Sequence, residues 1–392
     1  MAITRSKPPI SRPASPYLPP RGRVVARGQP LKIPAPLLSL AALLLVPAGC
    51  APGDTPLTLE QLAELATAED DVVYTYGMPD DYGGYRVAFQ RFEERHGIRR
   101  LDLSMSSTAV LERLAEERDD PQTDAVVVGA LRAHEAVEQE LVDCVPLGAA
   151  ADYPPEHVGR GEDGCVQWID TFTGTLGFMV NLEVVDQPPR TWSELLQPDI
   201  ARQVTFLDPR ASATGIATLL AAARAMGGSA EDPSPGAELL VAIAEAGGAD
   251  PMLQRQDYDG FLRGTRPILI NYDYNERQLK ERYDIEVEFV VPLDGTVSMP
   301  YSTLLVRDRP HPHGGQLLME YLHGQPGQGA LDEGGVTPLR PGAAGSRSAA
   351  KDSTVPAGVE VWEIQRDEVG PQLDAIRRAF DREVARLERA RP

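Results

Sequence analysis

The sequence predicts an α/β fold in two lobes, with mixed sheets flanked by helices, and three observations support this prediction. Short β-branched segments alternate with amphipathic helical segments from residue 72 onward, which favours a sheet covered by helices. A second block of the same kind follows, with helices of its own. Two extended segments after that block lead back to the first one, so we expect two crossing strands that form a hinge between the lobes.

The first block predicts three strand–helix pairs. The strands are expected over 72–76, 101–105 and 124–128, and the helices over 85–96, 106–117 and 131–140. The first strand is β-branched and aromatic, Gly97 ends the first helix, and Ser106 is a typical N-cap residue for the second. Ligands in such sheets bind outside the carboxyl ends of the strands, so the residues that follow the strands are candidates for a site.

The second block and the return complete the predicted order of elements. We expect strands over 171–181, 203–207 and 267–271, helices over 212–226, 236–246 and 276–283, return strands over 285–291 and 297–306, and helices over 314–323 and 367–388. The chain is therefore divided into a signal peptide (1–49), a lipid-anchored tether (50–70), the first part of lobe one (71–175), lobe two (176–288), the return of lobe one (289–345), and a loop with the C-terminal helix (346–392).

The N-terminus is typical of an exported protein. Residues 1–36 are basic and rich in proline, and residues 37–46 form an apolar run that is too short to span a membrane. Small residues then lead to Cys50, which indicates a signal peptide. The segment resembles the lipobox of bacterial lipoproteins, in which Cys50 is the lipidated residue, although Pro47 stands where leucine is usual. We expect a periplasmic or cell-envelope protein held at the membrane by its lipid only.

The remaining cysteines and the charge limit the other possibilities. Cys144 and Cys165 form either a disulfide or two buried thiols. The six histidines are scattered and there is no Cys-x-x-Cys motif, so neither a metal nor another cofactor is expected. The formal net charge of −20 argues against a nucleic-acid partner.

Four motifs in order resemble a known family. They are the strand–loop segment Val73–Asp81, the segment Pro189–Leu196, the Asp-Pro and Ser-x-Thr-Gly pattern within Asp208–Gly215, and the return segment Asp294–Tyr301. Together they resemble extracellular solute-binding proteins of ABC importers, in the branch that includes iron(III), thiamine, polyamine and 2-aminoethylphosphonate binders. This resemblance implies a type II periplasmic-binding-protein fold, with a permease and its ATPase as partners.

The candidate ligand site combines acidic, aromatic and hydroxyl side chains. Carboxylates beside aromatic rings suit an organic cation, whereas hydroxyls at helix N-termini suit an anion or are ordinary N-caps. Asp80 is also consistent with a plain turn residue or a charge at a helix N-terminus. The candidate residues are Tyr76, Gly77, Asp80, Asp81, Ser106, Ser107, Gly129, Ser212, Thr214, Tyr272, Asp273, Tyr274 and Ser298.

The predicted function is that of a receptor without catalysis. We expect a monomer that binds a small organic amine or aminophosphonate, such as 2-aminoethylphosphonate or a polyamine, by hinge closure. A ferric-iron receptor of the same fold is the first alternative, although Asp273 stands where iron binders of the family have a tyrosine. A hydrolase is less expected, because the common catalytic motifs are absent from the sequence. A receptor that signals to a membrane sensor would use the same fold.

Overall fold

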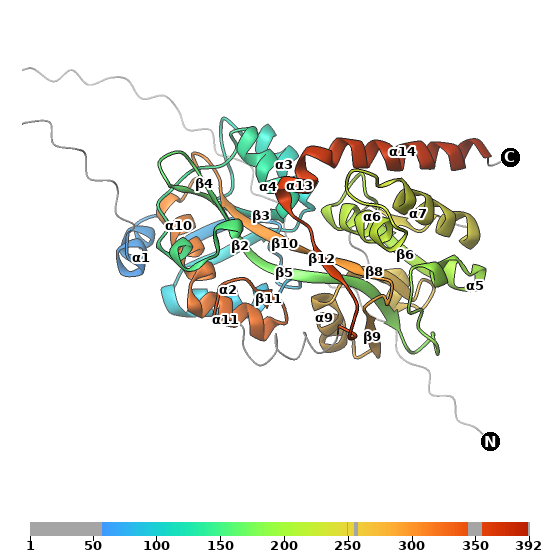
Figure 1. The fold of residues 1–392 in the computed structure, drawn as a ribbon. Coiled ribbons are helices and arrows are strands. Elements are labelled where there is room, and N and C mark those ends of the chain that lie inside the picture. The colour runs from blue at the N-terminus through green and yellow to red at the C-terminus, as the bar shows by residue number, and fades with distance from the viewer. Residues whose placement is uncertain (1–56, 249, 255–257, 344–354, 391–392) are drawn as a thin grey trace, which may run out of the picture. The chain divides into compact units, whose positions relative to one another are not determined.

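One long strand, β5 (Val166–Asn181), belongs to two groups of strands in the computed structural model (Figure 1). Its first half pairs antiparallel with β10 (Thr296–Leu305) up to Thr175, and its second half pairs antiparallel with β8 (Ile268–Tyr272) from Leu176 onward. The structure describes residues 57–248, 250–254, 258–343 and 355–390. We call the strands on the β10 side lobe one and those on the β8 side lobe two.

Lobe one is a mixed sheet with the order β2, β1, β3, β10, β5. The strands β2 (Arg99–Leu103) and β3 (Ala125–Gly129) lie parallel to β1 (Val72–Tyr76) on its two sides, and β10 is antiparallel to β3. The helices of this lobe are α1 (Leu59–Thr67), α2 (Tyr85–His96), α3 (Ser107–Glu116), α4 (Ala130–Glu138), α10 (Pro312–His323) and α11 (Gln325–Gly334).

Lobe two continues the strand order as β5, β8, β6, β7, with β9 (Val287–Val290) beside β5. Its parallel strands are β6 (Val204–Leu207), β7 (Met252–Leu253) and β8. Its helices are α5 (Pro198–Ala201), α6 (Ala213–Ala225), α7 (Ser234–Gly247), α8 (Asp259–Leu262) and α9 (Tyr274–Tyr283). The alanine-rich helix α6 is buried over most of its length, since small side chains let it pack closely against α7.

The C-terminal segment contacts both lobes. Strand β12 (Val361–Glu363) pairs parallel with β10, a short helix α13 (Arg366–Val369) follows, and the long helix α14 (Leu373–Ala390) packs on α7 (Figure 1). Ile376, Phe380 and Val384 form the buried stripe of α14, at the spacing of an amphipathic helix. Two further short strands, β4 (Val158–Arg160) and β11 (Thr337–Pro338), pair with β5.

Two glycines flank the point where β5 passes from one group of strands to the other. A Cβ atom on Gly174 would lie 2.4 Å from the ring of Tyr274, and one on Gly177 would lie 2.5 Å from the ring of Phe289. Both distances are shorter than real Cβ contacts, so these positions require glycine because aromatic rings of lobe two lie directly on the strand.

A buried carboxylate, Asp170 on β5, connects segments that are far apart in the sequence. It accepts hydrogen bonds from Ser302 Oγ of β10 at 2.5 Å and from Arg366 Nη2 of α13 at 2.7 Å. His157 Nδ1 lies 3.2 Å from the second carboxylate oxygen. Arg366 also donates to the carbonyl of Ala130 and stacks on Trp168, with its guanidinium carbon 3.6 Å from the ring centroid. This carboxylate therefore ties the C-terminal segment to the sheet of lobe one.

The α/β architecture predicted from the sequence is confirmed, and most element bounds agree within two residues. Strand β5 begins at Val166, five residues before the prediction, and α11 has no counterpart among the predicted elements. The predicted helix over 367–388 is interrupted by a 3-10 turn at Gly370–Gln372, since Pro371 has no N–H to donate. The exact lobe boundaries stay predictions.

Cys144 and Cys165 form a disulfide, with their Cα atoms 5.4 Å apart. The sequence left a disulfide and two buried thiols as alternatives, and the structure has the disulfide. The predicted signal peptide, Cys50 and most of the tether lie outside the described residues, as does most of the loop that starts at residue 346. Within the described ranges, every helix is too short or too polar to cross a membrane.

We predict that His323 makes the protein less stable in acid. The side chain is fully buried, with Nδ1 2.9 Å from the carbonyl of Met319 and Nε2 3.2 Å from Thr171 Oγ1, so a charge on the ring would be shielded from water. Burial lowers the pKa of His323 to about 4. The unfolded chain takes up this proton near pH 6.5 and the folded chain does not. The free energy of unfolding should therefore fall by about 3 kcal/mol as the pH drops from about 6.5 to about 4.

Denaturant unfolding at several pH values would measure this effect as the difference between the wild type and a variant. His323→Gln should remove this fall in the free energy of unfolding between about pH 6.5 and about pH 4. The matched change His134→Gln, at an exposed histidine, should leave it unchanged. An H323Q variant that loses as much stability as the wild type over this range would contradict the prediction.

Candidate functional site

A pocket of about 340 Å³ lies where the two lobes face each other. Most of its lining comes from the loops that follow the carboxyl ends of β1, β2, β6 and β7, which is where ligands bind in sheets of this type. The volume is that of a small-molecule site. The lining residues are Gly77, Pro79, Asp81, Tyr82, Ser104, Met105, Ser106, Ser107, Val127, Leu207, Ser212, Ala213, Thr214, Gln254, Tyr258 and Tyr301.

The N-terminus of α3 opens into this pocket from lobe one. Ser106 is its N-cap, and Ser106 Oγ accepts a hydrogen bond from the Ala109 N–H at 3.3 Å. Ser107 Oγ accepts one from the N–H of Gly129 at 3.0 Å. Within the described ranges neither hydroxyl donates a hydrogen bond, and the first N–H groups of a helix have no acceptor within it. This end of the pocket therefore carries hydrogen-bond donors and the positive end of a helix dipole.

The N-terminus of α6 opens into the same pocket from lobe two. Its N-cap, Ser212, makes no side-chain capping bond, and Thr214 Oγ1 lies 3.3 Å from the Tyr301 hydroxyl. Residues 208–212 connect strand β6 to this helix, and Gly215 lets the first turn pack closely on that connection: a Cβ atom there would lie 2.4 Å from the carbonyl oxygen of Asp208. Two helix N-termini from different lobes therefore meet at one pocket, an arrangement suited to an anion.

Asp81 is the one charged side chain among the described residues that line the pocket. Its carboxylate Oδ2 accepts a hydrogen bond from Arg282 of α9, in the opposite lobe. Both side chains are about half exposed, so this ion pair is weak on its own. A carboxylate has about four acceptor positions, which leaves Asp81 with the capacity to bind a cationic ligand group as well.

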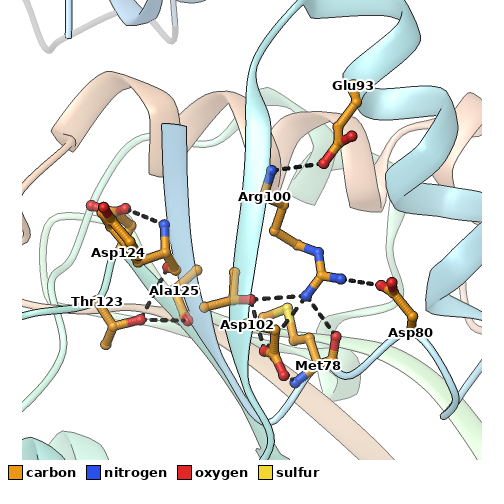
Figure 2. Close-up of polar contacts among 10 residues, drawn as sticks. Met78, Asp80, Glu93, Arg100, Asp102, Thr123, Asp124 and Ala125 are labelled. Atoms are coloured by element: carbon orange, nitrogen blue, oxygen red, sulfur yellow. Dashed lines mark hydrogen bonds and ion pairs between the residues drawn. The ribbon is translucent and has the colours of Figure 1, made fainter. Parts of the chain in front are cut away.

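Asp80 has a different surrounding from its neighbour. Its carboxylate accepts a hydrogen bond from Arg100 of β2, as Figure 2 shows, and it is absent from the pocket lining. Of the two adjacent acidic residues that the sequence proposes as ligand contacts, only Asp81 reaches the pocket. Asp80 instead belongs to a cluster of charged residues behind the loop.

Tyrosines form the wall of the pocket between the lobes. Tyr82 and Tyr301 line it, and Tyr272 and Tyr274 stack behind them with their ring centroids 5.5 Å apart. The hydroxyls of Tyr82 and Tyr274 lie 2.5 Å from each other. Burial raises the pKa of Tyr82, Tyr272 and Tyr274 well above the ordinary value. These side chains are therefore neutral hydrogen-bonding groups at physiological pH.

One face of α9 contacts the loop that carries Asp81. Tyr274, Gln278 and Arg282 are spaced four residues apart, so they lie on one side of the helix. Tyr274 bonds to Tyr82, the Gln278 amide faces the carbonyl of Asp81 and the N–H of Gly83, and Arg282 bonds to the Asp81 carboxylate. Three successive turns of this lobe-two helix therefore contact the loop between β1 and α2, residues 77–84, which we call the first pocket loop.

Some of the predicted site residues line the pocket and the others lie outside its lining. Gly77, Asp81, Ser106, Ser107, Ser212 and Thr214 line the pocket, whereas Tyr76, Asp80, Gly129, Tyr272, Asp273, Tyr274 and Ser298 do not.

The residues outside the lining have structural contacts of their own. The Tyr76 hydroxyl bonds to Glu117, Asp273 begins α9 by accepting from the Tyr274 N–H, and Ser298 pairs along β10 with Thr175 of β5. Gly129 lies under the pocket, where a Cβ atom would be 2.8 Å from that of Ala213, so it lets α6 approach β3.

Sequence reasoning missed several lining residues, among them Tyr82, Gln254, Tyr258 and Tyr301. Tyr301 ends the return motif that begins at Asp294, so the motif itself carried a signal for it. Gln254 donates to Asp208 of the motif that precedes α6, a contact across 46 positions that no local pattern indicates. In the part of the chain that the structure describes, no group of three or more His, Cys, Asp or Glu side chains is arranged to hold a metal ion.

Known proteins resemble this chain in sequence. Residues 139–364 match the family described as bacterial extracellular solute-binding protein. A periplasmic protein of Salmonella typhi, named for 2-aminoethylphosphonate binding, is 23% identical over 330 residues, which cover 81% of this chain and 94% of that protein.

Solved periplasmic binding proteins have the same fold. The periplasmic binding protein P5PA has a TM-score of 0.64 at 18% identity, over 81% of this chain and 99% of its own. AfuA from Actinobacillus pleuropneumoniae, solved with fructose-6-phosphate bound, has a TM-score of 0.62 at 15% identity, over 81% of this chain and 98% of its own. The predicted type II periplasmic-binding-protein fold is therefore confirmed.

Proposed function

Because the chain belongs to the family of bacterial extracellular solute-binding proteins, we propose that it captures an aminophosphonate such as 2-aminoethylphosphonate and delivers it to an ABC permease. The name of the Salmonella typhi relative supports this ligand class. Capture takes place by closure of the two lobes around the pocket, and the protein performs no chemical step on its ligand.

The observation that carries the proposal is the meeting of two helix N-termini at one pocket. The α3 end supplies the Ser106 and Ser107 hydroxyls, and the α6 end supplies Ser212 and Thr214. A phosphonate has three oxygens that accept hydrogen bonds from such groups, and two helix dipoles favour its negative charge. No arginine or lysine is among the described lining residues, so these dipoles and hydroxyls have to supply the attraction.

The ammonium group of the ligand is assigned to Asp81. This carboxylate lines the same pocket as the rings of Tyr82 and Tyr301. A carboxylate with neighbouring aromatic rings attracts an organic cation. A polyamine would use Asp81 but would bring positive charge toward both helix N-termini, which is unfavourable. The pocket therefore favours a zwitterion.

Ferric iron is less favoured as the ligand. Iron(III) prefers anionic oxygen ligands, and burial raises the pKa of Tyr82, Tyr272 and Tyr274 so that their phenolates are costly to form. Asp81, the one carboxylate among the described lining residues, already bonds to Arg282. Extracytoplasmic location follows from the family, whereas the lipid anchor at Cys50, the monomeric state and the permease partner are parts of the proposal.

Isothermal titration of the purified, ligand-stripped protein tests the proposal. We expect 2-aminoethylphosphonate to bind at least about 100-fold more tightly than ethylphosphonate, which lacks the amine, and than propylamine, which lacks the phosphonate. At a concentration of about 100 times its dissociation constant, the ligand should raise the free energy of unfolding by about 2.7 kcal/mol.

The same titration separates the alternatives. Spermidine and ferric citrate serve as probes of the polyamine and iron functions. Inorganic phosphate tests whether the two helix N-termini bind an anion without an ammonium group at Asp81. Tight binding of spermidine or ferric citrate without binding of 2-aminoethylphosphonate would contradict the proposal. Release of a chemically changed ligand after prolonged incubation would show that the protein is an enzyme.

A further inference from the structure

The first pocket loop, residues 77–84, is bonded to β2 through its backbone at Gly77 and through side chains of β2 at Met78. Met78, between the lining residues Gly77 and Pro79, is fully buried. Its N–H donates to Asp102 Oδ1 at 2.9 Å, and its carbonyl accepts from Arg100 Nη1 at 2.8 Å. Both backbone groups of this one residue are therefore bonded to side chains of the neighbouring strand β2.

The strand register explains why these two side chains reach the loop. Arg100 and Asp102 are two positions apart on β2, so they project from the same face of the sheet. Thr75 of β1 lies opposite Asp102, and Thr75 Oγ1 is 2.8 Å from Asp102 Oδ1 and 3.2 Å from Arg100 Nη1. Figure 2 shows the Arg100 guanidinium between Met78 and Asp80, with Asp102 beside it.

The Arg100 and Asp102 side chains are buried, although β2 is the edge strand of the sheet. The Arg100 and Asp102 side chains are 5% and 7% exposed, whereas Leu101 and Leu103 on the other face of β2 are among the exposed large apolar residues. The Arg100 guanidinium also lies over the Phe89 ring, 4.0 Å from its centroid. Burying two charges is costly unless their hydrogen bonds are satisfied, and most of those bonds are made to Met78, Thr75 and Asp80.

We propose that Arg100 and Asp102 are positioning residues for ligand binding. They fix the Met78 backbone, so that Gly77, Pro79 and Asp81 keep the conformation in which they line the pocket. The inference rests on the proposed function, since it assigns these residues a role in the same pocket. Neither side chain lines the pocket, so their effect on the ligand passes through the loop.

One detail of Asp102 provides a sharp test. Oδ1 makes the bonds to Met78 and Thr75, whereas Oδ2 is buried and has no hydrogen-bond partner among the described residues. An asparagine can therefore keep the bonding oxygen in place and put its amide group at the position of Oδ2. Asp102→Asn should preserve the loop, whereas Asp102→Ala removes the acceptor for the Met78 N–H.

Hydrogen–deuterium exchange of a peptide that covers residues 77–82 measures the positioning directly, without any ligand. In D102A we expect the Met78 amide to exchange at least about 10-fold faster, and the affinity for 2-aminoethylphosphonate to fall by about 10-fold, because one hydrogen bond is lost. D102N should retain both properties within about 3-fold. Arg99→Ala, on the exposed side of the same strand, is the matched control and should change neither.

Two results would overturn the proposal. One is a D102A protein with unchanged exchange at Met78 and unchanged affinity, and the other is a D102N protein that loses as much as D102A. If D102A does not fold, Arg100→Met allows the same comparison, because it removes the donor to the Met78 carbonyl and keeps an apolar stem over Phe89. If the wild type does not bind 2-aminoethylphosphonate, the proposed function fails, while the exchange data still decide whether Arg100 and Asp102 hold the loop.

Discussion

Replacing Ser106 with aspartate is expected to weaken the binding of 2-aminoethylphosphonate by at least about 100-fold while the folding stability is kept. Ser106 is both the N-cap of α3 and a lining residue of the pocket. Aspartate caps a helix as well as serine does, and its charge favours the helix N-terminus. The same charge repels a phosphonate by about 4 kcal/mol at a separation of about 4 Å and an effective dielectric constant of about 20.

Calorimetric titration and chemical unfolding of the same preparations separate the two roles of this serine. Thr58→Asp is the matched control, since Thr58 is the N-cap of α1 and lies outside the pocket lining. It should leave the affinity unchanged. If S106D binds the ligand as tightly as the wild type does, the hydroxyls at the helix ends are ordinary caps and the anion site is wrongly assigned.

Replacing Asp170 with alanine is expected to lower the free energy of unfolding by about 3 to 5 kcal/mol. The Asp170 and Arg366 side chains are 2% and 11% exposed, so the substitution leaves a buried guanidinium without its carboxylate. Ser302 and His157 lose the same partner. Urea unfolding followed by circular dichroism would measure the change.

A double variant identifies the cause of this loss. If the stranded charge is responsible, Asp170→Ala combined with Arg366→Met should be more stable than D170A alone by at least about 1 kcal/mol. The exposed pair of Arg91 and Glu333 provides the control, and Glu333→Ala should change the stability by less than about 1 kcal/mol. A double variant no more stable than D170A would show that lost packing, rather than charge, explains the effect.

Local sequence patterns predicted much of the fold because they act over short distances. The bounds of β1 and α2 follow from a β-branched run and from a helix that Gly97 ends. The early start of β5 and the helix α11 were missed for the opposite reason. Residues 166–170 include polar side chains whose burial depends on β4 and β10, and α11 contains three glycines that few isolated helices would tolerate.

In the site, too, local patterns predicted only what depends on nearby residues. The serines at the starts of α3 and α6 were predicted because N-cap residues follow the ends of strands. Asp80 and Asp81 are indistinguishable as a local pattern. Asp80 is held by Arg100 and Asp81 by Arg282, partners that lie 20 and 201 positions away, and only the folded chain brings them together.

The glycines in β5 have a consequence for how the protein can be observed. The ring of Tyr274 lies on the strand at Gly174, and its hydroxyl contacts that of Tyr82 in the other lobe. Any bending of β5 between its two groups of strands must shift this ring and expose its neighbours to water. The ultraviolet absorption of these tyrosines should therefore report opening and closing in real time, in a protein that needs no attached dye.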